Sequence, residues 1–417
     1  MKLLFLSHYG ELLGANRSLL SLLKGLKNHT SKNIKSFVVV AGEGEFTEEL
    51  KKNDIEFEII PFLLNMQVIS PKEKGFKKIF RSLFFKYSAV QSKVKNEKAI
   101  LKILKWVEQK NIDVVHSNAS VFDVGQFLAN ALRVPHIQHF REFGDKDYFL
   151  VPYTSWQNIR QEWQKLDAKI VISKAIQNHH FPTQESRKDK KGKLNTFLIY
   201  NGIFEKSVFE ELKKRFEQEQ NNPQTETNKP FIFTILGLLH PAKGQAEAIK
   251  AFAEIQKKYP NTVLQLIGKS NFKGYQEELE SLVKEYSLEE KVIFEGYISN
   301  PITKLLESDV LLMCSTAEGM GRVTIEGMAC GCVLIGKNSG ATGELIEHKQ
   351  TGFLYNSDYK NLAKQMAFVL ENQELCNEIR QNAFEFVKEN FSTESYVSKV
   401  IEAYHTVADS LQLSEKK

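Results

Sequence analysis

The 417-residue sequence has few cysteines and lacks long hydrophobic runs. Because a membrane-spanning helix needs roughly 20 consecutive apolar residues, no span is predicted. The chain passes from Met1 and Lys2 directly into an apolar strand at 3–6, without the longer apolar core and cleavage site of a signal peptide. Four cysteines are too few and too unevenly spaced for a disulfide framework. The composition therefore predicts a cytoplasmic protein.

The cysteines also give no sign of a metal site. Cys314 and Cys330 fall in apolar surroundings and Cys332 begins a strand, so we interpret all three as small core residues in a reducing compartment. The pair Cys330-Gly331-Cys332 is a candidate metal-binding pair, but no further histidine or cysteine completes a site. No metal cofactor is predicted.

The charge is unevenly distributed although the net value is only +5. Residues 72–105 hold eleven Lys or Arg against two Glu, a local balance of +9, so the remainder is near −4. Five apolar residues in this stretch share one helical face: Phe76, Ile79, Phe80, Leu83 and Phe84. Two interpretations are equally supported: a helix lying on an anionic membrane surface, or an amphipathic helix that buries its phenylalanines in the core. Nucleic acid is not a predicted partner, because no nucleic-acid module accompanies the charge.

Strands and helices alternate along the chain, which predicts a doubly wound α/β architecture. At this length and with 42% hydrophobic residues, two domains are expected. Residues 217–229 are polar and of low complexity, which is typical of a flexible linker. We predict a first domain at 1–203 with 392–417, a linker at 216–230, and a second domain at 231–391.

A strand–turn–helix unit in the second domain carries two glutamates. An apolar strand at 310–314 precedes a turn at 315–321 with two glycines, and a helix follows to about Cys330. Glu318 therefore lies at the carboxyl end of a strand, where open α/β sheets bind ligands. The amides near Gly319 and Gly321 could face an anion such as a diphosphate, and a carboxylate is a strong acceptor for sugar hydroxyls.

This stretch, E-G-M-G-R-V-T-I-E from Glu318 to Glu326, resembles the donor site of retaining, metal-independent glycosyltransferases of family four (glycosyltransferase group 1). Their signature is two glutamates separated by seven residues, and the similarity continues through 327–346 and 351–355. The resemblance implies the GT-B fold, with two Rossmann-like domains facing a cleft and the final helix, 393–411, crossing back onto the first. The alternative is an ordinary strand–turn–helix with two solvated glutamates.

The resemblance also implies an activity. A sugar would pass from a nucleotide diphosphosugar, such as a UDP-sugar, to a glycan or lipid-linked acceptor with retention of configuration and without a metal. The setting would be polysaccharide or glycoconjugate synthesis in the cytoplasm or at the inner face of the membrane. Lys243 and Arg322 would neutralise the diphosphate, Glu326 would hold the ribose, and Glu318 would contact the sugar. The remaining donor-binding residues would be Gly14, Ala15, Tyr297, Ile298, Gly319, Met320 and Gly321.

The sequence differs from the family pattern at one basic residue. The family has Gly-Arg followed by Lys-Gly; Lys243 and Gly244 fit, but Leu238 stands in place of the arginine. We hypothesise that Arg322 supplies the second positive charge, because arginine suits phosphate oxygens in a bidentate geometry. The alternative is a surface arginine at a helix start, where the helix dipole disfavours it.

The segment V-P-H-I-Q-H-F-R-E-F at 134–143 is the best candidate for the acceptor side. By resemblance His139 would orient the sugar or acceptor, with Arg141 and Glu142 as neighbours. The alternative is a packing histidine. Likewise, the segment around Gly14 and Ala15 is either part of the site or a plain strand–helix connection.

Two other classes of protein share this architecture. One is a non-catalytic GT-B partner subunit or glycan-binding protein, which degraded glutamates and glycines would favour; they are intact here. The other is a GT-B sugar-nucleotide epimerase or phosphorylase, whose site motifs differ from the two glutamates of this chain. The fold alone does not separate these classes.

Overall fold

A computed structural model describes residues 1–29, 34–68, 77–189, 192–221, 229–270 and 272–412. The chain divides into two compact units. Unit 1 comprises Met1–Gly202 together with Thr393–Lys417, and unit 2 comprises Ile203–Ser392. Across the described ranges, no helix combines the length and the apolar character that crossing a membrane requires.

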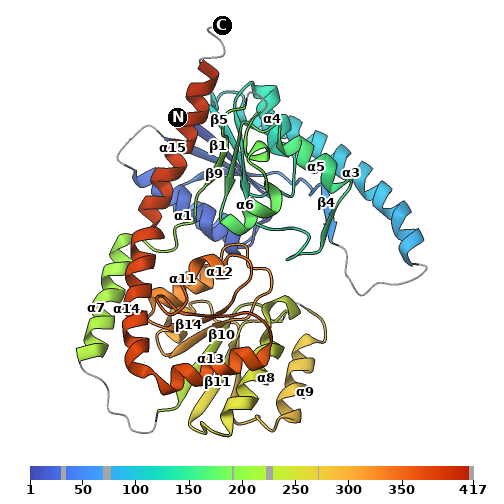
Figure 1. The fold of residues 1–417 in the computed structure, drawn as a ribbon. Helices are drawn as coiled ribbons and strands as arrows, with labels where there is room; N and C mark the ends of the chain where they lie inside the picture. The colour runs from blue at the N-terminus through green and yellow to red at the C-terminus, as the bar shows by residue number, and fades with distance from the viewer. Residues whose placement is uncertain (30–33, 69–76, 190–191, 222–228, 271, 413–417) are drawn as a thin grey trace. The chain divides into compact units, whose positions relative to one another are not determined.

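Unit 1 is built on a seven-stranded parallel sheet in the order β3-β2-β1-β5-β6-β8-β9 (Figure 1). The strands are β1 (Lys2–Ser7), β2 (Lys35–Val40), β3 (Glu56–Ile59), β5 (Val114–Ser117), β6 (His136–Phe140), β8 (Ala168–Val171) and β9 (Thr196–Leu198). A separate antiparallel pair joins β4 (Met66–Val68) to β7 (Leu150–Pro152). The apolar run of β1 is buried, as expected where helices cover both faces of a parallel sheet.

The helices of unit 1 are α1 (Gly14–Asn28), α2 (Glu45–Lys52), α3 (Lys77–Val107), α4 (Val124–Leu132), α5 (Trp156–Trp163), α6 (Lys174–His180) and α15 (Thr393–Gln412), with a 3-10 turn η1 (Glu185–Arg187). Helix α15 runs alongside α1 and adds Tyr396, Val400 and Tyr404 to the same buried core (Figure 1). The predicted return of the final helix to the first domain is therefore confirmed.

Helix α3 is far longer than the amphipathic helix predicted from Phe76 to Lys86. Phe76 itself, and the side chains of the other four residues of its predicted apolar face, lie outside the described part of the structure. The choice between membrane and core for that face therefore stays a prediction. The later turns of α3 are described, and they are considered below.

Unit 2 contains a six-stranded parallel sheet in the order β12-β11-β10-β13-β14-β15. The strands are β10 (Phe231–Leu236), β11 (Thr262–Ile267), β12 (Val292–Gly296), β13 (Val310–Met313), β14 (Val333–Lys337) and β15 (Phe353–Tyr355). The helices are α7 (Lys206–Asn221), α8 (Gln245–Gln256), α9 (Tyr275–Glu285), α10 (Ile302–Leu305), α11 (Arg322–Ala329), α12 (Thr342–Leu345), α13 (Tyr359–Glu371) and α14 (Gln373–Asn390), with a 3-10 turn η2 (Pro241–Lys243). Both units are therefore Rossmann-like, as predicted.

The linker predicted at 216–230 begins too early. Helix α7 continues to Asn221, and residues 222–228 lie outside the described ranges. Phe216 stacks on Phe384 with ring centroids 6.1 Å apart and also packs beside Gly331. The glutamate-rich and glutamine-rich composition concealed a helix that this contact holds against α14.

The cysteines occupy the core, as predicted. Cys314, Cys330 and Cys332 are buried and carry free thiols. Burial raises the pKa of the Cys314 thiol to about 12, so this side chain stays neutral.

Candidate functional site

The strand order of unit 2 places a topological switch point between β10 and β13. From β10 the chain moves outward to β11 and β12, then returns to the other side of β10 as β13, followed by β14 and β15. The switch point therefore lies between the loops that follow β10 and β13, at the carboxyl edge of the sheet. Open α/β sheets bind ligands in this position.

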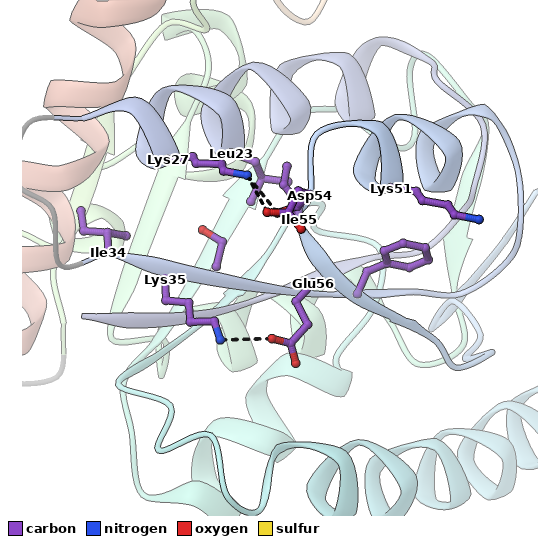
Figure 2. A pocket seen from close by; sticks show the side chains of 10 residues that line it. Leu23, Lys27, Ile34, Lys35, Lys51, Asp54, Ile55 and Glu56 are labelled. Carbon is purple, nitrogen blue, oxygen red and sulfur yellow. Dashed lines mark hydrogen bonds and ion pairs between the residues drawn. The ribbon is translucent and has the colours of Figure 1, made fainter.

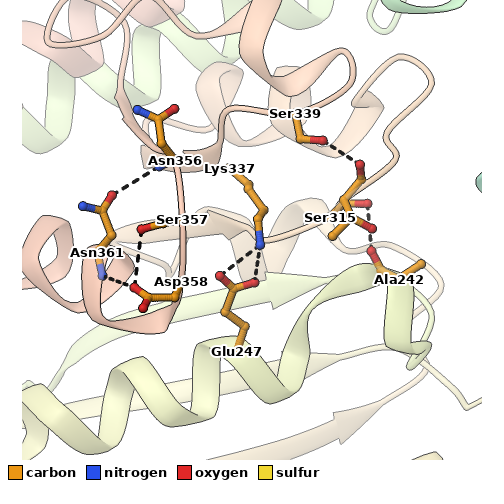
Figure 3. Close-up of polar contacts among 10 residues, drawn as sticks. Ala242, Glu247, Ser315, Lys337, Ser339, Asn356, Ser357, Asp358 and Asn361 are labelled. Atoms are coloured by element: carbon orange, nitrogen blue, oxygen red, sulfur yellow. Dashed lines mark hydrogen bonds and ion pairs between the residues drawn. The ribbon is translucent and has the colours of Figure 1, made fainter. Parts of the chain in front are cut away.

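Backbone contacts join the two loops at the switch point. Ala242 O accepts hydrogen bonds from Thr316 N (3.1 Å) and from Ser315 Oγ (3.2 Å; Figure 3). Gly244 has a φ of +75°, and a Cβ there would lie 2.5 Å from Cys314 O. The close approach of the loops thus requires glycine at this position.

Two ion pairs lie in this region. Lys243 Nζ is 2.7 Å from Glu318 Oε2 and bridges the two loops. Arg322 Nε is 2.7 Å from Glu326 Oε1, one turn along α11. The structure therefore brings Lys243 and Glu318 together, and it pairs Arg322 with the glutamate that was predicted to hold the ribose.

One nitrogen of the Arg322 guanidinium donates no hydrogen bond to the described residues. Its Nη1 is sealed from solvent and has no hydrogen-bond partner among the described residues. The Glu326 side chain is only 8% exposed. Buried donors are normally satisfied, so an unpaired one marks a position where an acceptor is expected to bind.

A second loop fixes the backbone of Glu318. Ala341 N donates to Glu318 O (2.8 Å), and a Cβ on Gly340 would lie 2.6 Å from the same oxygen. Ser339 Oγ donates to Thr316 O (2.6 Å). The turn at 315–321 is therefore held from both sides, and α11 begins at once after Gly321, whose φ is +75°.

Polar pairs that the sequence analysis did not identify support these loops. Lys337, at the end of β14, contacts both carboxylate oxygens of Glu247 on α8, at 2.8 and 3.1 Å (Figure 3). Asp358 caps α13 by accepting from Asn361 N (3.2 Å). Lys337 and Glu247 are 90 residues apart, so only the position of Lys337 after an apolar strand could have suggested it.

The remaining donor-side residues lie at the same edge but are less enclosed. Tyr297 follows β12 and is 57% exposed, with Lys269 Nζ 5.5 Å from its ring centroid. Ile298 is partly buried. Because β12 is two strands from β10, these residues follow a more distant strand of the sheet than Lys243 does. Their role in donor binding stays a prediction.

Unit 1 has its own switch point, between β1 and β5. Asn118, just after β5, donates to Ala15 O (3.3 Å), and Asn16 accepts from Ser7 Oγ (2.6 Å). Gly14 is exposed and begins α1, which has no side-chain cap, so its first amides remain available to an acceptor. The structure therefore places Gly14 and Ala15 at a plausible ligand-binding edge of unit 1.

Arg141 is buried beside this edge and contacts several side chains. Its Nε donates to both Asn118 O and Oδ1 (3.0 Å each), and its Nη1 donates to Asn201 Oδ1 (2.7 Å). Its Nη2 lies 3.1 Å from His139 Nδ1 and 3.4 Å from Tyr396 Oη. The guanidinium thereby connects the ends of β5 and β6 to helix α15.

His139 is completely buried within this network. Its Nδ1 also lies 3.3 Å from His116 Nε2, while its own Nε2 has no partner among the described residues. Burial and the nearby Arg141 charge hold the pKa of His139 well below its usual value, so the ring is neutral. These contacts fit the packing interpretation; a contact with substrate stays a prediction.

The sequence analysis names Glu142 only as a neighbour of His139, yet the pKa of its carboxyl is strongly shifted. Its Oε1 accepts from Ser120 N (2.8 Å) and Ser120 Oγ (2.7 Å). Burial raises the pKa of this carboxyl to about 7. Burial and the nearby Glu142 charge likewise raise the pKa of Tyr9 to about 12. Perturbed groups of this kind at a strand edge are candidates for a functional site.

A hollow elsewhere in unit 1 is not part of this site. It has a volume of about 640 Å³ and lies at the amino ends of β2 and β3 (Figure 2). Lys27 pairs with Asp54 (3.1 Å) and Lys35 with Glu56 (3.2 Å), so most of the charged side chains that line it are already paired. Within the described ranges, no group of three or more His, Cys, Asp or Glu side chains is arranged to hold a metal ion.

Comparisons with known proteins find similar sequences and similar folds. Residues 216–386 match the family model of the glycosyl transferases group 1. A curated relative, N-acetyl-alpha-D-glucosaminyl L-malate synthase of Bacillus anthracis, is 24% identical over 79% of this chain and 86% of its own length. A Campylobacter jejuni relative, N-acetylgalactosamine-N,N'-diacetylbacillosaminyl-diphospho-undecaprenol 4-alpha-N-acetylgalactosaminyltransferase, is 31% identical over 37% of this chain and 40% of its own.

Among solved structures, HepE of Anabaena in complex with UDP aligns over 97% of this chain and 100% of its own, with a TM-score of 0.76 and 21% identity. The fold is thus the GT-B fold of glycosyltransferases. Residues 216–386, within unit 2, are similar to the group 1 glycosyl transferases.

Proposed function

We propose that this protein transfers a sugar from a UDP-sugar to a glycan or lipid-linked acceptor, with retention of configuration and without a metal ion. The observation that carries the proposal is the pair of ionic contacts at the switch point of unit 2, Lys243 with Glu318 and Arg322 with Glu326. They put two cations and two sugar-binding carboxylates on adjoining elements of one edge.

In this proposal the cations stabilise the departing diphosphate. Lys243 turns from Glu318 toward one phosphate, and Arg322 offers its unpaired Nη1 to the other. The first amides of α11 add partial positive charge, because Gly321 supplies no side-chain cap. Donors fixed before the reaction lower the barrier by stabilising the charge that develops on the leaving group.

The carboxylates then position the donor. Glu326, largely buried, accepts from the ribose hydroxyls, while Glu318 accepts from the sugar once Lys243 has turned away. Gly319, Met320 and Gly321 bring the backbone close to the ligand. Ionised acceptors give the stronger hydrogen bonds, so each contact has a measurable effect.

The relatives support the substrate classes. Solved structures of Anabaena HepE contain UDP and UDP-glucose. The name of the Campylobacter relative includes a diphospho-undecaprenol acceptor. On this basis the donor is a UDP-sugar, and the acceptor is a glycan or a lipid-linked glycan. Unit 1 would supply the acceptor side, with His139 orienting the sugar or acceptor.

The decisive experiment measures release of nucleoside diphosphate from UDP-, GDP- and ADP-sugars in EDTA. The wild type should release UDP slowly, with water as the acceptor. Glu326→Gln should be at least about tenfold slower, because a charge-assisted hydrogen bond contributes roughly 1.5–3 kcal/mol. Glu289→Gln, at an exposed glutamate of the same unit, is the matched control. NMR of the released sugar would report whether the anomeric configuration is retained.

If no sugar nucleotide releases its nucleoside diphosphate and no nucleotide shifts the thermal midpoint, the proposal is rejected and a non-catalytic partner subunit is favoured. Activity that EDTA abolishes and Mg²⁺ restores would reject the metal-independent part alone.

A second test addresses the unusual cation. Arg322→Gln should weaken UDP binding about tenfold in calorimetry, because it removes the charge and most of the donors offered to the diphosphate. Arg380→Gln, elsewhere in unit 2, should bind UDP like the wild type. Equal affinity in both variants would show that Arg322 serves only to fix Glu326.

A further inference from the structure

One face of helix α3 packs against the rest of unit 1. Ile103 and Val107 are buried, and Asn96 exchanges two hydrogen bonds with the backbone of Leu63, at 2.7 and 3.0 Å. Ser92 Oγ donates to Leu64 O (2.8 Å). This face attaches the later turns of α3 to the rest of the unit. Figure 1 shows that α3 runs along the outside of unit 1 and that its first turns project away from the sheet.

The opposite face of α3 carries an exposed apolar stripe. Its members, exposed by 60, 63, 44 and 67% respectively, are Tyr87, Val90, Val94 and Leu101. They are spaced by three, four and seven residues, so they fall in one row along the helix. At roughly 100° per residue, that row lies on the side away from Asn96 and Ile103. Between Val94 and Leu101 the row is interrupted by the exposed Glu97 and Lys98. Single exposed apolar residues are ordinary, but a row of them along one helix face marks an interaction surface.

Lysines flank the apolar stripe on both sides. Between residues 85 and 107 the exposed charged residues are Lys86, Lys93, Lys95, Lys98, Lys102, Lys105 and Glu97, a balance of +5. None of these lysines forms an ion pair with another described residue. The surface therefore combines exposed apolar side chains with uncompensated positive charge.

The positive charge of the flanking lysines indicates which partner binds the apolar stripe. A second copy of the chain, pairing stripe to stripe, would bring two rows of lysines together with a single Glu97 on each side. A neutral partner would leave the lysines without counter-charges. A helix with an apolar stripe between lysines is the form that lies in the headgroup region of an anionic bilayer.

We propose that the apolar stripe of α3 and its flanking lysines dock this protein on an anionic membrane surface. Val90, Val94 and Leu101 enter the boundary between headgroups and acyl chains, and the lysines contact phosphates of anionic lipids. The docking surface consists of described residues from 87 to 105 and does not depend on the apolar face predicted at 76–84. It goes beyond sugar transfer, and its test does not use the enzyme's activity.

The experiment is vesicle flotation of the full chain at low salt. The protein should bind mixed phosphatidylcholine–phosphatidylglycerol vesicles but not pure phosphatidylcholine vesicles. It should dissociate as the salt concentration rises. Val90→Ser with Leu101→Ser should weaken binding more than about tenfold, because two exposed apolar side chains are lost. Lys98→Gln with Lys102→Gln should weaken it roughly fivefold per lysine.

Leu194→Ser is the matched control, since Leu194 is 62% exposed in unit 1 but lies outside α3. Its binding should equal that of the wild type, and all variants should keep the wild-type circular dichroism and thermal midpoint. Absence of binding to mixed vesicles, equal binding to neutral vesicles, or undiminished binding of the Val90/Leu101 variant would each overturn the proposal. So would a concentration-dependent dimer that the same variant abolishes, because the stripe would then join two copies.

Discussion

Glu142 offers a sharp test of the electrostatics of unit 1. Its carboxyl is buried, and only Ser120 donates to it among the described residues. Arg141, its neighbour in sequence, directs its guanidinium to Asn118 and Asn201 instead. The carboxyl therefore gains little from ionisation in the folded protein, and burial raises its pKa from 4.5 to about 7.

This pKa shift has a definite sign for stability. Between pH 4.5 and 7 the folded protein holds a proton at Glu142 that the unfolded chain has released. The stabilisation linked to that proton is complete below pH 4.5 and is lost as the pH rises through 7. Integrated from pH 5 to pH 8, the loss is roughly 2–3 kcal/mol.

Glu142→Gln should remove this loss. The amide oxygen can still accept from Ser120, but it does not titrate. Relative to the wild type, the free energy of unfolding of the variant should therefore rise by roughly 2–3 kcal/mol between pH 5 and pH 8. The buried histidines, whose pKa values are lowered, impose the opposite slope, but they do so equally in both proteins and cancel in the difference.

Urea unfolding followed by tryptophan fluorescence measures this difference. The three tryptophans, Trp106, Trp156 and Trp163, all belong to unit 1, so the signal reports the unit that contains Glu142. Glu108→Gln, at an exposed glutamate of unit 1, should show the wild-type pH dependence. If wild type and Glu142→Gln keep a constant gap across this pH range, the carboxyl is ionised in the folded state and the argument from burial fails.

Two further changes test packing. Gly244→Ala should cost unit 2 about 2–3 kcal/mol in thermal unfolding, because the backbone is left-handed and the new Cβ would meet Cys314 O. Gly274→Ala has a similar φ of +80° with open space around it, so it should cost only about 1–2 kcal/mol; equal losses would refute the steric reasoning. Tyr404→Phe should cost about 1–3 kcal/mol, because it removes the partner 2.7 Å from the buried Nδ1 of His116. Unchanged urea unfolding would show that His116 finds another partner.

Local pattern was sufficient for the strand–turn–helix that carries the two glutamates. The apolar run at 310–314 predicted β13, and the glycines of the turn predicted the sharp entry into α11. Lys243 and Gly244 were identified by their resemblance to the Lys-Gly pair that follows a strand in the family. In each instance the information lay within about ten residues.

Local pattern failed where the determining contact comes from far along the chain. The last turns of helix α7, from Phe216 to Asn221, fall within the predicted linker, because their polar composition gives no sign of the contact between Phe216 and Phe384 of α14. His139 could be placed at a strand end, but its burial depends on His116 and Arg141. The support that Lys337 gives Glu247 was invisible for the same reason.

The sequence by itself determined the two sheets, the position of the glutamate motif and the strong positive charge of 72–105, because these depend on short-range periodicity and composition. Only the tertiary structure decided which charges pair at the switch point of unit 2, that Arg141 joins β5 and β6 to α15, and which side of α3 remains uncovered. Hydrogen bonds and burial depend on the approach of segments tens to hundreds of residues apart, and no local pattern specifies that approach.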